Sequence, residues 1–195
     1  MIAAAVTLVA DRLNQHLRTR FSVGDDLAAP SPPVDAEGKQ PAGARNRLIL
    51  FITGVTRESL ARALPPRAPP GGGRSAVATE PVQLNVHLMM AAAFDADNYL
   101  ESLKVLSAGA RFFQANPVFS PNRAQGAGLA QLAIEISDLD VEAANQIWSM
   151  HGGRYLPSIH YKLRLVTIDA AAVTREEPLV LRPRSDIEPS REHAP

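Results

Sequence analysis

Residues 47–55, "RLILFITGV", form a run in which both alternating sets of side chains are mainly apolar. This pattern predicts a strand that is covered on both faces, as in the middle of a sheet. The run "VQLNVHLMM" at 82–90 alternates instead, with apolar even-numbered residues and with Gln83, Asn85 and His87 among the others. It predicts a half-buried strand. Two such strands outside a strict strand–helix–strand repeat favour an α+β arrangement.

Helical periodicity appears before and after these strands. Residues 2–20 carry apolar side chains at spacings of three and four, which predicts an amphipathic helix. Two further helices are predicted at 97–114 and 140–151, with Asp97 and Asp140 as their N-caps. We expect the first of these two to bury Leu100, Leu103, Leu106, Ala110 and Phe113, and the second Val141, Ala144, Ile147 and Trp148. Strands are also predicted at 129–137 and 158–168.

The predicted fold is therefore α+β: a mixed, mainly antiparallel sheet of about four strands with helices packed on it. We expect a single domain over residues 1–170. Two stretches rich in Pro, Gly and Ala, at about 24–45 and 65–80, predict long flexible loops. The charged, proline-broken residues 171–195 predict an extended C-terminal arm.

The amino-acid composition limits the kinds of functional site that this chain can form. The 195 residues include 20 Lys plus Arg, 20 Asp plus Glu and no cysteine. The absence of cysteine excludes disulfides, thiolate catalysis and zinc sites built on sulfur. A formal charge of zero argues against a globally basic nucleic-acid binder, and such chains tend to associate. The apolar run at the N-terminus is too short to span a membrane and lacks the charged start of a signal peptide, so we expect a cytoplasmic location.

The stretch "HGGRYLPSIHYKLR" at 151–164 is the densest candidate site. His151 and His160 are nine residues apart, which does not match the H-E-x-x-H metal signature. Gly152 and Gly153 follow a helix rather than precede one, so they favour a helix C-cap over a phosphate loop or an oxyanion site. No G-x-S-x-G nucleophile motif is present. We therefore expect no catalytic residue, no bound cofactor and no metal.

The same stretch predicts a polar face on the last strand. His160, Lys162 and Arg164 share one side of that strand, and Arg154 and Tyr155 precede it. Basic residues interleaved with aromatic ones can stack nucleic-acid bases. Aromatic residues make up only 5% of the chain, however, and no nucleic-acid motif is present. A protein-facing surface is the favoured interpretation.

Three long runs of the sequence resemble one family in the same order. They are "MIAAAVTLVADRLNQHLRTRF", "PVQLNVHLMMAAAFDADNYLESLKVLSAGARFFQANPVFSP" and "LAIEISDLDVEAANQIWSMHGGRYLPSIHYKLRLVTID". The family is the N-terminal domain of the cap, or tail-terminator, protein of extracellular contractile injection systems, which are phage-tail-like particles. The resemblance covers roughly residues 1–25 and 80–170.

The resemblance implies a non-enzymatic structural role and a fold like that of phage tail terminators. Such proteins form a ring, a homohexamer, at the end of the particle distal to the baseplate, where they stop inner-tube growth and anchor the last sheath ring. The implied partners are other copies of the chain, the inner tube protein and the contractile sheath protein, without nucleic acid or a membrane span. The alternative is a baseplate or tube-adaptor component of the same kind of particle. The particle would assemble in the cytoplasm and then be released or stay there.

Two segments and several single residues are candidates for subunit, sheath or tube contacts. Either residues 170–195 or the loop at 24–45 are expected to reach neighbouring subunits, because an extended arm can supply a strand to a free sheet edge. Many relatives carry further C-terminal domains, whereas this chain ends in a short arm. The candidate interface residues are Arg154, Tyr155, His160, Lys162, Arg164, Leu179, Val180 and Leu181.

Overall fold

The computed structural model describes residues 2–58, 74–78, 84–120, 131–166 and 173–178. The chain divides into two compact units: residues 1–62 with 81–169, and residues 63–80 with 170–195. In the second unit, β3 (Arg74–Ala78) pairs antiparallel with β8 (Val173–Pro178). The sequence predicts a flexible loop over the first of these stretches and an extended arm over the second.

The first unit contains a six-stranded sheet in the order β1-β2-β4-β7-β6-β5. At one edge, β1 (Ala28–Pro30) runs parallel to β2 (Arg47–Arg57), and all other neighbours are antiparallel. The remaining strands are β4 (Leu84–Ala93), β7 (Ser158–Val166), β6 (Gln131–Ile136) and β5 (Val118–Phe119). The prediction of a mixed, mainly antiparallel sheet is confirmed. The two strands beyond the four expected are the short edge strands β1 and β5.

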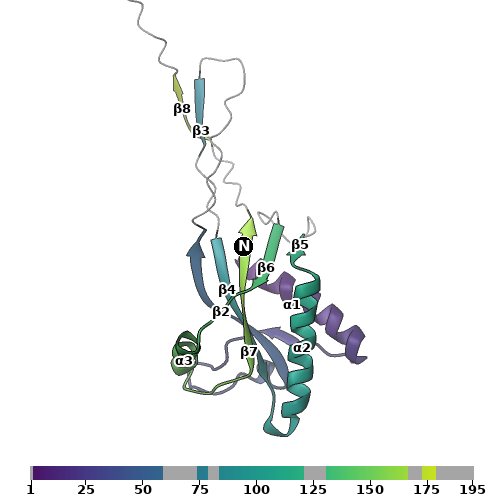
Figure 1. Ribbon diagram of the computed structural model, residues 1–195. Helices are drawn as coiled ribbons and strands as arrows, with labels where there is room; N and C mark the ends of the chain where they lie inside the picture. The colour runs from purple at the N-terminus through teal and green to yellow at the C-terminus, as the bar shows by residue number, and fades with distance from the viewer. Residues whose placement is uncertain (1, 59–73, 79–83, 121–130, 167–172, 179–195) are drawn as a thin grey trace, which may run out of the picture. The chain divides into compact units, whose positions relative to one another are not determined.

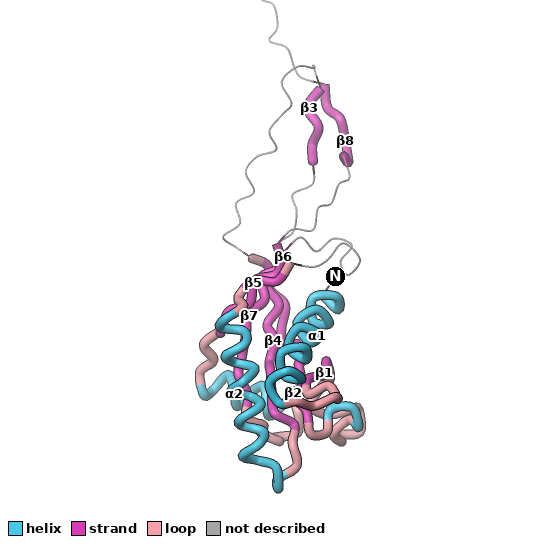
Figure 2. Tube along the Cα trace, turned by 90° about the vertical axis from the view of Figure 1, so that its right-hand side faces the viewer, coloured by secondary structure: helices cyan, strands magenta, loops and turns pink. Residues whose placement is uncertain are grey.

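Helices cover both faces of this sheet (Figure 1). On one face, α1 (Ile2–Phe21) and α2 (Tyr99–Ala115) pack over the even-numbered core residues of β4, including Val86, Leu88 and Met90. Figure 2 shows these two helices crossing in front of the strands. On the other face, α3 (Val141–Met150) places Trp148 against Phe51 and Met89. The α1/α2 layer and α3 therefore lie on opposite sides of one sheet.

The prediction that β4 is half-buried is wrong. Asn85 and Met89 lie on the face assigned to solvent, yet they are only 6% and 1% exposed. Met89 is covered by α3, which belongs to the same core cluster. The strand also continues to Ala93, through small apolar residues that are buried on both faces. β4 is thus a central strand that is buried except at Leu84 and His87, which are partly exposed, and it is paired along both of its edges.

The buried stripes of α2 and α3 also differ from those predicted. In α2 the buried residues include Ser102, Val105 and Gly109, whereas Leu100 is 72% exposed. A Cβ at Gly109 would lie 3.0 Å from the Met90 sulfur, so α2 approaches the sheet along its small side chains and turns Leu100 outward. In α3 only Trp148 is fully buried, because the helix meets the sheet through its second half.

The two predicted N-caps have different outcomes. Asp140 accepts a hydrogen bond from the Ala143 backbone N–H at 2.7 Å, which confirms it as the cap of α3. Asp97 is not the cap of α2. Residues 96–98 form a short 3-10 turn, and Asn98 occupies the cap position without a side-chain cap bond.

The segment 24–45 is not a loop throughout. It contains β1 and a 3-10 turn at Ala42–Ala44. A buried side chain on α1 holds β1 in place: the Asn14 amide donates to the Ala28 carbonyl oxygen and accepts from the Ala28 N–H, each at 2.8 Å. The Asn14 side chain thus takes the place of a partner strand on the outer side of β1 and satisfies its buried backbone groups. Since β1 depends on this contact and not on a repeated spacing of apolar residues, periodicity did not reveal it.

We expect Asn14→Leu to lower the free energy of unfolding by about 3 kcal/mol, because two buried backbone groups of Ala28 lose their partners. Urea denaturation followed by circular dichroism measures the change. Gln15→Ala, at the exposed neighbouring position, is the control and should alter stability by less than about 0.5 kcal/mol. A loss equally small in Asn14→Leu would show that this bridge does not hold β1.

Candidate interaction surfaces

The turn after α3 is a helix stop, as predicted. Gly152 and Gly153 have positive φ values of 77° and 70°, a conformation that favours glycine. The Gly153 N–H donates to the Trp148 carbonyl oxygen at 2.9 Å, which closes the last turn of the helix. The His151 ring packs edge-on against Phe51, with ring centroids 5.3 Å apart. These contacts give His151 and the two glycines a structural role.

The five described candidate interface residues do not form one patch. Arg154 and Tyr155 are exposed in the loop before β7, where Tyr155 packs edge-on against Trp148. His160, Lys162 and Arg164 lie farther along β7. Arg164 is six residue steps beyond Ser158 on the strand, which corresponds to about 20 Å. Leu179, Val180 and Leu181 lie outside the described residues.

His160 is a packed residue and not a free surface group, since it is only 8% exposed. Its Nε2 lies 3.1 Å from the Thr53 hydroxyl, and its ring stacks on His87 with a centroid distance of 5.6 Å. Burial lowers the pKa of His160 below its ordinary value, and the charge of neighbouring His87 lowers it further. The neutral imidazole is therefore the form that this packing favours.

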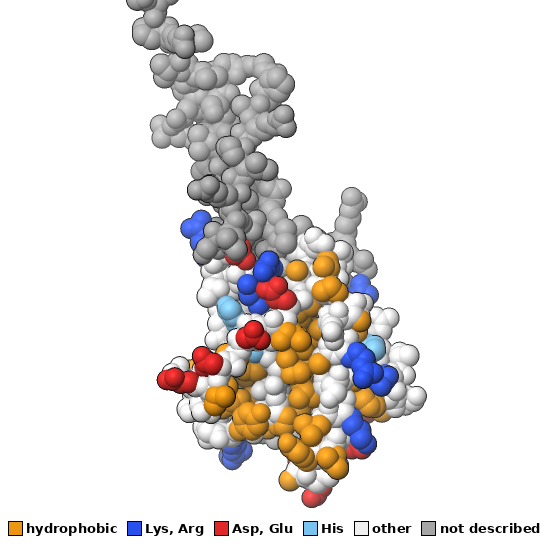
Figure 3. All heavy atoms as spheres, viewed as in Figure 1, with side chains coloured by type: hydrophobic (Ala, Val, Ile, Leu, Met, Phe, Trp, Pro, Cys, Tyr) orange, Lys and Arg blue, Asp and Glu red, His pale blue; other side chains and the backbone are white. Residues whose placement is uncertain are grey.

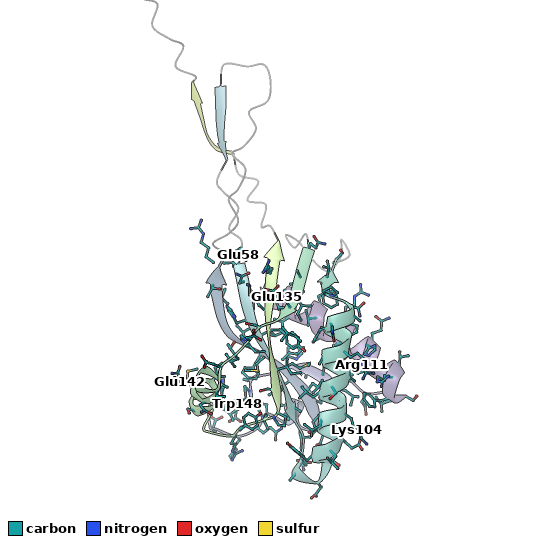
Figure 4. The ribbon with its side chains drawn as sticks, in the orientation of Figure 1. Glu58, Lys104, Arg111, Glu135, Glu142 and Trp148 are labelled. Carbon is teal, nitrogen blue, oxygen red and sulfur yellow. The ribbon has the colours of Figure 1, made fainter. Side chains whose placement is uncertain are left out.

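Lys162 and Arg164 are neutralised by acidic partners. The Glu135 carboxylate on β6 lies 3.2 Å from Lys162 Nζ and 3.0 Å from an Arg164 guanidinium nitrogen, and Arg164 also faces Glu58 at 3.9 Å. Burial raises the pKa of Glu135, but the bonds to Lys162 and Arg164 outweigh it and hold that pKa below its ordinary value. Acidic and basic side chains lie beside each other on this face in Figure 3, and Figure 4 labels Glu58 and Glu135. The expected basic face is thus a charge-balanced network.

A second surface, which we did not identify from the sequence, lies between α1 and α2 on the opposite face. Residues of both helices line two hollows here, of about 430 and 540 Å³. The four-residue spacing of Arg12, His16 and Arg20 along α1 is the sequence signal that could have revealed it. Figure 4 shows Arg111 and Lys104 on the outer side of α2. We call this surface the interhelix groove.

Two further kinds of site, a metal-binding cluster and a membrane-spanning helix, were sought in the described part of the chain. There, no group of three or more histidine, aspartate or glutamate side chains could hold a metal ion. Within the same ranges, no helix has both the length and the apolar character needed to cross a bilayer.

Sequence comparison assigns a family to most of the chain. Residues 4–182 match the family described as the Pvc16 N-terminal domain. No curated protein matches the sequence significantly.

Two solved structures are similar to this chain. One is the PVC sheath/tube terminator of an extracellular contractile injection system in its extended state, with a TM-score of 0.58 and 14% identity. That alignment covers 100% of this chain and 65% of the solved chain. The other is the tube-terminating cap of the anti-feeding prophage, with a TM-score of 0.44, 12% identity, and coverage of 96% and 59%. This chain therefore spans less than two thirds of either solved chain.

We expect acid to destabilise the fold partly through His160. Its pKa in the folded chain is below the ordinary value of 6.5, so the unfolded chain binds the proton more readily. This contribution to stability is present above pH 6.5 and is lost as the pH falls through the lowered pKa. Between pH 7.5 and 5, the free energy of unfolding should fall less in His160→Phe than in the wild type. Equal falls in urea denaturation at the two pH values would contradict the assignment.

Proposed function

We propose, from the premise that this chain belongs to the Pvc16 N-terminal domain family, that it is a structural cap of a contractile injection particle. In this role it forms a ring at the end distal to the baseplate, ends the growth of the inner tube and anchors the last sheath ring. Its partners are further copies of itself, as a homohexamer, together with the tube protein and the contractile sheath protein.

The match of residues 4–182 to the family carries this proposal. The fold supports it, because the chain aligns over its full length with a solved chain named as a sheath/tube terminator, at a TM-score of 0.58. A capping role requires surfaces for neighbours and for the tube and sheath, and not a reactive centre. The packed His151 and the ion-paired Lys162 agree with such a passive role.

The physical properties of the chain suit a ring subunit. Its formal charge is zero, so copies do not repel one another through net charge. Both sheet edges end in short strands, β1 and β5, and short edges discourage indiscriminate pairing with other chains. We propose that exposed Arg154 and Tyr155 contribute to contacts within the particle, which would assemble in the cytoplasm.

Removing the gene should give particles with tubes of uneven, excessive length or without an attached sheath, because nothing stops tube addition or holds the last sheath ring. Electron micrographs of purified particles provide the length distribution. The control is a strain in which the gene is restored on a plasmid, which should return tubes of uniform length. Uniform, sheathed tubes in the absence of the gene would contradict a capping role.

A further inference from the structure

The interhelix groove combines an apolar floor with a rim of cationic side chains. Phe21, Leu103 and Phe112 contribute to its lining, together with Leu100, which is 72% exposed. An exposed leucine beside partly buried apolar side chains in a hollow is a feature of docking sites for other proteins.

The charges of the groove are of one sign. Arg12, Arg20, Lys104 and Arg111 line it, and no aspartate or glutamate does. Lys104 is paired with Glu101 at 2.6 Å, whereas Arg12, Arg20 and Arg111 form no ion pair within the described residues. Because the whole chain is neutral, this concentration of positive charge requires an excess of negative charge elsewhere.

A complementary segment lies at the start of α3. Residues 138–142, "DLDVE", hold three acidic residues and no basic one. Within this segment Val141 is 78% exposed. The segment is also held in shape: Leu139 packs against the core cluster of Trp148, and Asp140 caps the helix. An acidic segment held by such contacts, which we call the protrusion, loses less entropy on binding than a free chain would.

The groove and the protrusion lie on opposite faces of the sheet. Figure 4 places Glu142 on the side of α3, and Lys104 and Arg111 on the side of α1 and α2. Figure 3 shows the same division, with acidic side chains gathered near α3 and basic ones near α2. One subunit therefore cannot fill its own groove with this segment. Two surfaces that differ, on opposite sides of a subunit, are what a head-to-tail interface requires.

We infer that the interhelix groove receives residues 138–142 of a second copy of this chain, so that copies associate head to tail. The inference rests on the ring proposed above and assigns its lateral contact. In this contact, Val141 covers the apolar floor, and Asp138 and Glu142 face the arginines of the rim. A repeated head-to-tail contact closes into a ring when its rotation permits.

The absence of cysteine from the chain allows a direct test. The full chain carrying both Ser107→Cys, in the groove, and Val141→Cys, in the protrusion, has one thiol on each surface. We expect oxidation to give a ladder of covalent oligomers on a denaturing gel. The same treatment of complete particles built with this variant detects the contact even where the isolated chain does not associate.

Three controls separate a head-to-tail contact from other arrangements. Each single variant should stay monomeric, and a mixture of the two single variants should give dimers and nothing larger. Glu37→Cys combined with Val141→Cys moves one thiol to an exposed loop outside the groove and should give no ladder. Adding Arg111→Glu to the double-cysteine chain should reduce the oligomer yield about tenfold, because a like charge then faces Glu142.

The outcomes are distinguishable from those of the capping test. A ladder from the double variant supports the inference. Dimers from Val141→Cys alone would mean that two α3 faces meet, and would overturn it. No ladder in either sample, with particles of uniform tube length, would also overturn it but leave the capping role intact. A ladder accompanied by unregulated tube length would uphold the contact and count against capping.

Discussion

Strand β4 is hydrogen-bonded along both edges, to β2 and β7, and its residues 89–93 are buried on both faces. A strand of this kind must have a layer on each side, because its apolar side chains alternate between the two. The α1/α2 pair provides one layer and α3 the other. The groove and the acidic segment face in opposite directions as a consequence, and a ring subunit needs two such different surfaces.

Periodicity predicted the main strands and all three long helices, because each carries enough apolar residues to show its spacing. It did not reveal β1, which depends on a hydrogen-bonded bridge from Asn14, fourteen residues away. It also assigned Leu100 and Val141 to buried stripes, although both are exposed. The spacing of apolar residues does not determine which side of a helix faces the sheet. In α2 that side is set by small residues such as Gly109, which allow close approach to Met90.

The charge of the candidate surface on β7 could not be predicted from local sequence either. On the sequence alone, His160, Lys162 and Arg164 predict a basic face on one strand. The partners that change this interpretation come from elsewhere: Glu135 from β6, and Thr53 from the bulge in β2. The net charge of one face of a strand therefore depends on the side chains of the neighbouring strands as well as on its own. Arg12, Arg20 and Arg111 of the interhelix groove, which form no ion pair within the described residues, come from two helices nearly a hundred residues apart and meet only in the folded chain.

A cap lies at one end of a contractile particle, so the position of this chain in the particle is the sharpest test of the proposed role. The measurement is electron microscopy of purified particles in which the chain carries a peptide tag bound by gold-labelled antibody. We expect gold at one end only, the end opposite the baseplate, on nearly every particle. Gold at the baseplate end would instead support a baseplate or adaptor component, and gold along the shaft or absent from particles would contradict a cap.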